Sequence, residues 1–320
     1  MHRVLVVTAA SALAALTACS APSTSPPSGT SAAHASTAPT TGPVTVYTLE
    51  KPEHRNPAPI TWHAASSTFF VGAWYDGSIY RGSPDDPTVR VFLEGQPGQA
   101  ATGIGVAGER LVIAGGLNGD IRAYDMRTKQ RVGEFSTGSG GFLHGLHVTD
   151  TGHVWVTDAV RPVLWHLTAE QVAAGTGTPT SIPLSPEIPY VNGPDNLEGV
   201  VALSDTRLVV VKYADGALYR IDLDPQAPQG RTITPIADAT ARLGSKMILD
   251  GNRLVVPDED GLSVVELDAE ATRGTVITRL RGPSFHDATS VARVGDRYLV
   301  VNAGWNDPPP YTISSVPVTS

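Results

Sequence analysis

The sequence predicts an all-β fold, a six-bladed β-propeller, on three observations. Short β-rich runs recur six times through the chain at intervals of about 42 to 54 residues, which is the period of propeller blades. Each run leads through a turn into a further strand, and several turns carry Asn-Gly or Asp-Gly, a strong hairpin signal. Helical periodicity is nearly absent. The six runs are Phe69–Trp74, Leu111–Gly116, Val154–Ala159, Leu208–Tyr213, Leu254–Glu259 and Tyr298–Ala303.

Residues 1–18 are predicted to be a lipoprotein signal peptide. The apolar run Val4–Leu16 is too short to cross a bilayer, and it leads into a Leu-Thr-Ala-Cys motif that ends at Cys19. This motif resembles the lipobox of bacterial lipoproteins, which implies cleavage before Cys19 and a lipid such as palmitate on its sulfur. An ordinary secretory signal is the alternative. Because Cys19 is the sole cysteine, it cannot form an internal disulfide.

Residues 19–43 are predicted to be a disordered tether. Their Ala, Ser, Thr, Pro and Gly side chains bury too little apolar surface to offset the entropy of ordering. The propeller then spans residues 44–320. Its last blade is one strand short, because little more than residues 311–316 remains after the sixth run. Residues 44–49 alternate like a half-buried strand, so we predict that they pair beside 311–316 and close the ring.

An insertion separates the third and fourth blades. Thr168 and Gln171 have the spacing of a capping box and Gly175 is a suitable terminator, so a short helix is predicted there. The insertion continues to Asn196 and is rich in Pro and Gly. It could be a surface connector or a lid over one face.

Upstream of each repeated run lies another strand, whose first residue precedes the run by nine to eleven positions in every copy. In a propeller these first strands line the central channel, so their starting residues are predicted to ring one mouth of it. The six ring residues are Ala58, Thr102, His144, Glu198, Ser245 and Thr289.

Residues 44–318 resemble the SMP-30/gluconolactonase-like propeller family, which is related in fold to strictosidine synthase. The resemblance rests on Phe69–Gly82, Val154–Asp158, Gly216–Asp222 and Thr289–Asn302. It implies the fold, and its lactonases hold a divalent metal through Glu, Asn and Asp side chains at the channel mouth. The four corresponding positions here carry Ala58, His144, Glu198 and Ser245. We therefore predict no cofactor, beyond weak binding of a divalent cation such as calcium, and assign no metal ligand.

Glu198 and His144 are the candidate catalytic pair. They open adjacent blades, where a carboxylate and an imidazole could shift each other's pKa and act as general base and acid. Alternatively, the two neutralise each other and fill the space of a lost metal. Aromatic residues in the turns and polar ring residues are candidates for ligand binding, although the aromatics could equally be packing residues. These candidates are Trp74, Tyr75, Thr102, Tyr213, Ser245, Thr289 and Trp305.

Together these features predict an extracytoplasmic, monomeric protein, anchored to the cell membrane through Cys19, that binds a small molecule or a protein partner at its channel mouth. An enzyme is the alternative, either a lactonase-like hydrolase or a metal-free acid–base catalyst using Glu198 and His144. A net charge of −8 without a basic stripe argues against nucleic acid as a partner. A scaffold that uses the outer surface has no sequence feature for or against it.

Overall fold

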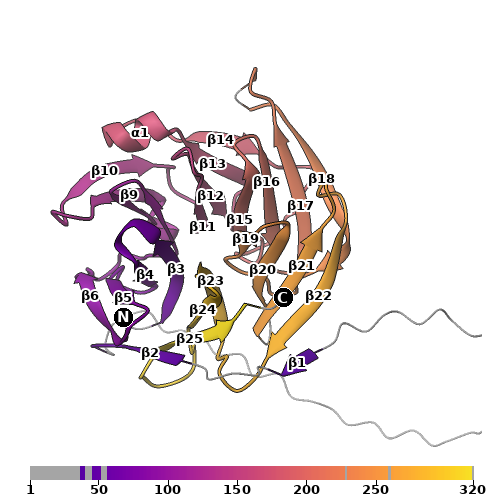
Figure 1. The fold of residues 1–320 in the computed structure, drawn as a ribbon. Coiled ribbons are helices and arrows are strands. Elements are labelled where there is room, and N and C mark those ends of the chain that lie inside the picture. Colours follow the sequence, from indigo (N-terminus) through magenta and orange to yellow (C-terminus); the bar gives the residue numbers. More distant parts are fainter. Residues whose placement is uncertain (1–36, 40–44, 52–55, 228, 259–260, 319–320) are drawn as a thin grey trace, which may run out of the picture. The chain divides into compact units, whose positions relative to one another are not determined.

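The computed structural model describes residues 37–39, 45–51, 56–227, 229–258 and 261–318. The chain divides into residues 1–34 and residues 35–320. The predicted signal peptide and most of the predicted tether lie outside the described residues. Within residues 35–320 nearly all regular structure is β-strand (Figure 1). No helix of the described residues is long and apolar enough to cross a bilayer.

All six repeated runs are strands, and each is the second strand of its sheet. Their side chains are almost entirely buried, because a neighbouring sheet covers each face, which explains why they are short continuous apolar runs. These strands are β4 (Thr68–Ala73), β8 (Arg110–Ala114), β12 (Val154–Asp158), β16 (Arg207–Lys212), β20 (Arg253–Asp258) and β24 (Arg297–Asn302).

The first strands of the sheets surround a central channel. Each contacts the first strand of the next sheet, and β23 returns to contact β3, so this inner layer closes on itself. The strands are β3 (Pro57–His63), β7 (Gly103–Ala107), β11 (Leu143–Val148), β15 (Leu197–Ser204), β19 (Ile248–Asp250) and β23 (Ala288–Val294). Sheets that pack face to face around a channel define a β-propeller.

Third and outer strands complete each antiparallel sheet. The third strands are β5 (Ile79–Ser83), β9 (Asp120–Asp125), β13 (Val163–Leu167), β17 (Ala217–Leu223), β21 (Gly261–Leu267) and β25 (Thr312–Pro317). The outer strands are β6 (Asp86–Leu93), β10 (Arg131–Ser136), β14 (Thr180–Pro183), β18 (Arg231–Thr240) and β22 (Gly274–Arg281). The turn glycine Gly216 has φ +72°, and a Cβ there would lie 2.5 Å from the Ala241 carbonyl carbon, so the turn requires glycine.

Strand β2 (Thr45–Leu49) joins the last sheet to the first. It pairs antiparallel with β25, with Thr45 opposite Ser315, and parallel with β6, so one eight-stranded sheet results. The predicted pairing of 44–49 beside 311–316 is confirmed for the described residues. Strand β1 (Thr37–Pro39) pairs parallel with the edge strand β22. These three residues belong to the predicted tether, and backbone pairing to a sheet edge needs no apolar side chain.

The insertion contains the predicted helix, α1 (Ala169–Ala174). Thr168 Oγ1 accepts a hydrogen bond from the Gln171 amide at 3.2 Å, and Gln171 Oε1 accepts one from the Thr168 amide at 2.9 Å, so the capping box is confirmed. Gly175 ends the helix with φ +74°. The insertion then supplies β14, the outer strand of its sheet, and is therefore more than a connector. Two short 3₁₀ helices, η1 (Ala64–Ser66) and η2 (Gly116–Asn118), lie elsewhere.

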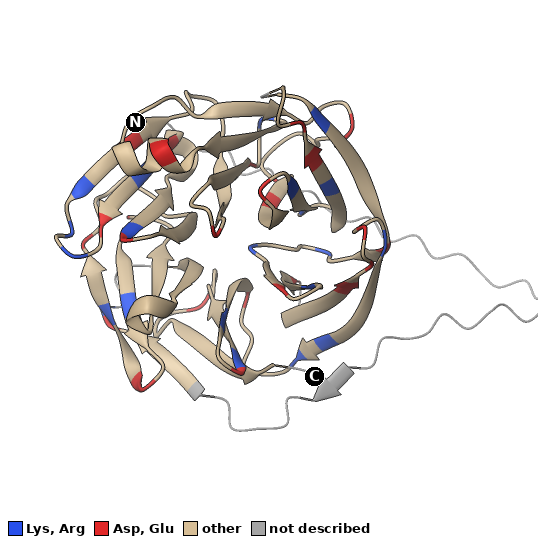
Figure 2. Ribbon diagram, turned by 45° about the horizontal axis from the view of Figure 1, so that its top comes forward, with Lys and Arg blue, Asp and Glu red and all other residues tan. Residues whose placement is uncertain are grey.

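The core consists of buried apolar clusters between neighbouring sheets. The cluster between the last and first sheets joins Tyr47 and Phe69 to Leu299, and equivalent clusters fill the other junctions. Charged residues of both signs are interspersed around the sheets (Figure 2).

Candidate functional site

The six predicted ring residues lie at the starts of the first strands, at one end of the channel. Two of them use their hydroxyls to tie neighbouring blades together. Thr102 Oγ1 donates to the Leu143 carbonyl at 2.7 Å, and Thr289 Oγ1 donates to the Ala58 carbonyl at 2.9 Å. The hydroxyl protons of Thr102 and Thr289 are therefore used by main-chain carbonyls of the inner strands.

Glu198 is the centre of a polar cluster that contains two other ring residues, Ser245 and His144. Its Oε2 accepts a hydrogen bond from Ser245 Oγ at 2.6 Å, and its Oε1 lies 3.4 Å from His144 Nε2. Ser245 Oγ in turn accepts a hydrogen bond from Lys246 Nζ at 3.4 Å. The side chains of His144 and Glu198 are 4% and 12% exposed, so the cluster is sheltered from bulk water.

Burial shifts the pKa values of all three titratable groups of this cluster. It raises the pKa of Glu198, against the opposing effects of Lys246 and the Ser245 hydrogen bond. It lowers the pKa of Lys246 to about 8, with Glu198 acting in the opposite direction. Burial, assisted by the Lys246 charge, holds the pKa of His144 well below its usual value. His144 is therefore neutral at pH 7, and its contact with Glu198 is not an ion pair.

This result corrects one expectation about the His144–Glu198 pair. The sequence suggested that the two side chains shift each other's pKa, but burial and Lys246 dominate both shifts. Lys246, which the sequence reasoning did not select, is the group that interacts electrostatically with both. The available signal was its place in the repeat: Lys246 follows a ring residue directly, where Gly103, Gly145 and Gly199 stand in other blades.

Aromatic side chains cover the cluster at the channel mouth. The Trp74 ring packs edge-on against Phe142, His144 and Trp305, with centroid distances of 5.5, 5.3 and 5.3 Å. Lys246 Nζ lies 5.8 Å from the centroid of the Trp74 ring, close enough for a cation–π contact.

Tyr213 and Tyr75, the other two predicted aromatic residues, differ in their surroundings. Burial raises the pKa of Tyr213, and the charges of Glu198, Asp195 and Asp287 raise it further, so this phenol lies among the carboxylates of the mouth. Tyr75 is 60% exposed. The structure therefore brings Trp74, Trp305 and Tyr213 to the site and leaves Tyr75 in solvent.

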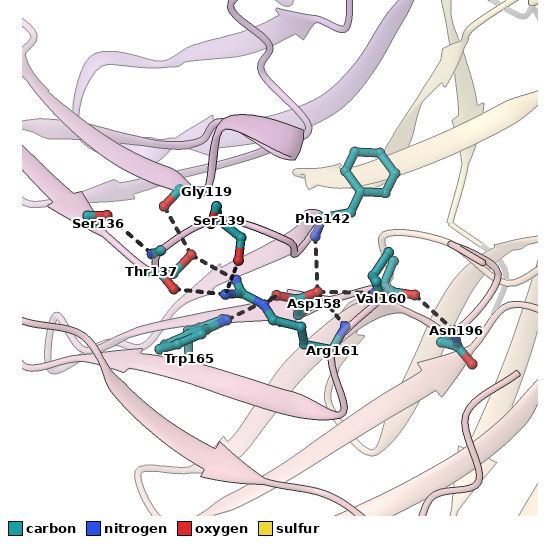
Figure 3. Close-up of polar contacts among 12 residues, drawn as sticks. Gly119, Ser136, Thr137, Ser139, Phe142, Asp158, Val160, Arg161, Trp165 and Asn196 are labelled. Carbon is teal, nitrogen blue, oxygen red and sulfur yellow. Dashed lines mark hydrogen bonds and ion pairs between the residues drawn. The ribbon is translucent and has the colours of Figure 1, made fainter. Parts of the chain in front are cut away.

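Asp158 fixes the loops that carry Phe142 and the end of the insertion (Figure 3). Its Oδ1 accepts a hydrogen bond from the Phe142 amide at 3.0 Å, and its Oδ2 pairs with Arg161 Nε at 2.7 Å. Asn196 Nδ2 donates to the Ala159 carbonyl at 2.9 Å, next to this network. The fully buried Asp158 carboxylate thus has partners for both oxygens and connects the segment that carries Phe142 to the turn that carries Arg161.

The residues at this mouth do not fit a divalent metal. Hard cations need several oxygen ligands, but the cluster offers a single carboxylate, Glu198, which already contacts Ser245 and the His144 imidazole. The Lys246 amine interacts electrostatically with Glu198, and Ser245 Oγ bridges the two side chains. Across the described ranges, no group of three or more His, Cys, Asp or Glu side chains is placed to hold a metal ion.

A cavity of about 640 Å³ occupies the channel below the ring residues. Its lining consists mainly of the first-strand residues that follow the ring positions and includes Asp150 and Asp205, just beyond the ends of β11 and β15. Of the polar cluster, Lys246 lines this cavity, whereas His144, Glu198 and Ser245 do not. The volume suits a small organic molecule.

Comparison with known proteins identifies the fold and no closer relationship. No family model matches this chain, and no curated protein matches its sequence. Among solved structures, the RRP9 WD40 repeats align with a TM-score of 0.57 and 11% identity over 86% of this chain and 98% of that one. A protein from Lactobacillus plantarum aligns with a TM-score of 0.57 and 14% identity over 77% of both chains. A gluconolactonase from Xanthomonas campestris aligns with a TM-score of 0.56 and 15% identity over 82% of this chain and 86% of that one.

The chain has a β-propeller fold. At these identities the similarity extends to the fold alone.

Proposed function

We propose that this chain is a six-bladed β-propeller, anchored outside the cytoplasmic membrane by a lipid on Cys19, that binds a small organic molecule in its central channel without a metal. The observation that carries the proposal is the buried cluster around Glu198, which lies between an aromatic mouth and a cavity of about 640 Å³. Clustered groups with shifted pKa values beside a cavity are typical of binding sites. The count of six blades is supported by the six first strands, each of which contacts the next so that they form a closed ring.

Lys246 is the cluster residue that can contact a ligand in the cavity, because it lines the cavity and its amine makes a single long hydrogen bond, to Ser245. Glu198 would act on a ligand indirectly, through its electrostatic effect on Lys246. The apolar strand residues that line the cavity would contact the rest of the molecule.

A thermal-shift screen with small organic molecules tests this proposal. Compounds that raise the melting temperature of the wild-type protein should do so less in Glu198→Gln, because the substitution removes the buried charge. Asp215→Asn is the matched control, since Asp215 is a half-exposed carboxylate that pairs with Lys212 away from the cavity. Equal stabilisation of the wild type and Glu198→Gln by every compound would contradict the proposal.

A lactone hydrolase is the second candidate. The similarity to a gluconolactonase and the carboxylate of raised pKa at the channel favour it. In this case Glu198 would activate water as a general base. Glucono-1,5-lactone hydrolysis, followed in a pH-stat with calcium and with EDTA, separates the two candidates. We expect no turnover above the buffer rate in either condition. Turnover that Glu198→Gln abolishes would instead establish the hydrolase.

A further inference from the structure

Lys246 occupies a position in the repeat where the other blades have small or compact residues. The residue after the ring position is glycine in three blades, and a Cβ on Gly145 or Gly199 would collide with the next blade's carbonyl. In the fifth blade the strand β19 begins only at Ile248, so this constraint is relaxed and a long side chain fits. The corresponding residues of the six blades are Pro59, Gly103, Gly145, Gly199, Lys246 and Ser290.

The Lys246 amine has few partners for a buried group. Its residue is 8% exposed, and its hydrogen bond to Ser245 Oγ is long, at 3.4 Å. No carboxylate of the described residues lies within ion-pair distance of it. Lys212 is buried to a similar degree but pairs with Asp215 at 2.8 Å. A buried ammonium without a close counter-charge is unfavourable, which favours the neutral, nucleophilic amine at Lys246.

We propose that Lys246 is a carbonyl-binding residue, whose amine forms a reversible imine with an uncharged aldehyde that enters the channel. Three features carry this inference: the residue lines the cavity, its amine lacks a close counter-ion, and the Ser245 hydroxyl links it to the Glu198 carboxylate. The pKa of about 8 that burial gives Lys246 supports it, because about a quarter of the amine is then unprotonated at pH 7.5. The proposal rests on the proposed binding function of the channel.

The reaction needs no oxidant, reductant or metal. The lone pair of Nζ attacks the carbonyl carbon, the C=O π electrons move to oxygen, and a proton passes from nitrogen to that oxygen to give a carbinolamine. Nitrogen then forms the C=N bond as the hydroxyl leaves with a proton, so amine and aldehyde become imine and water. The Glu198 carboxylate, acting through Ser245, can accept the proton that nitrogen loses and pass it to the leaving hydroxyl.

The charges around the cavity favour an uncharged aldehyde over a keto acid. The cavity is lined by the exposed carboxylates of Asp150 and Asp205, and its lining Arg293 already pairs with Asp250. Burial lowers the pKa of the lining His147 to about 4, so it is neutral at pH 7. A carboxylate ligand would therefore meet two negative charges and no free positive charge besides Lys246 itself.

Reductive trapping on the full mature chain tests the proposal. Benzaldehyde and sodium cyanoborohydride are added at pH 7.5, and labelling is mapped by mass spectrometry at the four lysines, Lys51, Lys129, Lys212 and Lys246. We expect saturable labelling of Lys246, at least about tenfold faster than that of the exposed Lys51 and Lys129, given the higher fraction of free amine. Buried Lys212 should remain unlabelled, and glyoxylate should label Lys246 more slowly than benzaldehyde does.

Lys246→Arg should lose the saturable label while it keeps its circular dichroism and the slow labelling of the surface lysines. Labelling confined to Lys51 and Lys129, or equal at all exposed and buried sites, would overturn the proposal.

Benzyl alcohol, which has no carbonyl, separates this failure from failure of the proposed function. If benzyl alcohol stabilises the wild type but not Glu198→Gln while no imine forms, the channel binds ligands and only the imine is wrong. If neither compound acts at the channel, both proposals fail.

Discussion

Lys246 and Lys212 are both buried lysines near the same end of the propeller, yet they differ in their counter-charges. Lys212 has a half-exposed carboxylate at 2.8 Å, whereas Lys246 interacts with Glu198 across Ser245. Burying a charge in a low-dielectric site lowers the free energy of unfolding, even when the charge has an indirect partner. Removal of that partner lowers the free energy of unfolding further, because the charge is then uncompensated. The two pairs therefore allow a direct comparison within one molecule.

At the residue scale we first predict strong coupling between Glu198 and Lys246. Glu198→Gln or Lys246→Met alone should lower the free energy of unfolding by about 3 kcal/mol, because each leaves one buried charge uncompensated. The double variant should return to within about 1 kcal/mol of the wild type. Urea denaturation of the four proteins measures this cycle.

The corresponding Asp215→Asn and Lys212→Met cycle should give a coupling of at most about 1 kcal/mol, because Asp215 is half exposed. Equal coupling in both cycles would refute the prediction.

The lowered pKa of Lys246 gives a second prediction at this scale. Burial lowers this pKa from 10.5 to about 8, so between these values the unfolded chain holds a proton that the folded protein has released. The free energy of unfolding therefore gains a contribution that increases as pH rises through this window, up to about 3 kcal/mol. The contribution should be missing in Lys246→Met. Urea denaturation at pH 7.5 and pH 10 measures the difference between the two proteins, and a difference independent of pH would show that Lys246 titrates normally.

At the element scale, β2 is the strand that closes the propeller. Its Tyr47 is 3% exposed, packs edge-on against Phe69 at 5.3 Å, and donates its hydroxyl proton to the Pro84 carbonyl. Leu49 is equally buried. Because β2 pairs with β25 on one side and β6 on the other, its loss would expose two strand edges together with the core between the last and first sheets.

We predict that deletion of Thr45–Leu49 destabilises the propeller strongly. Loss of the two buried side chains alone should cost about 3–6 kcal/mol, and the exposed edges should promote aggregation. Deletion of residues 20–36 is the control, and it stops before β1 because Thr37–Pro39 pair with β22. That deletion should leave the melting temperature nearly unchanged. Calorimetry and size-exclusion chromatography compare the two, and equal stability would mean that the ring closes in another way.

At the scale of the whole molecule, the propeller and the proposed anchor have separate roles. The residues of the channel lie between Asn56 and Asn302, far along the chain from Cys19. A lipid on Cys19 would fix the location of the protein without entering the binding site. Function of the channel should therefore be preserved in a protein that lacks the anchor.

We predict that the wild-type protein fractionates with membranes and that Cys19→Ala does not. A diacylglycerol group together with an N-acyl chain anchors stably, whereas one acyl chain binds only marginally. Fractionation followed by mass spectrometry of the N-terminal peptide measures this, and Cys19→Ala should keep the melting temperature of the wild type. Wild-type protein that is wholly soluble with an intact N-terminal peptide would refute the lipoprotein assignment.

The sequence by itself determined the features that depend on local pattern. The six second strands are continuous apolar runs, the turns carry glycine where a positive φ is needed, and Thr168 with Gln171 caps α1; each signal lies within about ten residues. The position of β2 was also predictable, because an incomplete last blade requires a strand from the other end of the chain. The ring positions followed from the constant register of the repeat.

Only the tertiary structure decided the chemistry of the channel. Thr102 and Thr289 bond to carbonyls of neighbouring blades, and Lys246 reaches across to Glu198, 48 positions earlier in the chain. Such contacts join residues on different blades, and their strength depends on burial, which one blade cannot provide alone. The repeat pattern in the sequence determines the backbone position of each of these side chains. The pKa shifts of Glu198, His144 and Lys246 instead arise because the blades together bury these groups away from water.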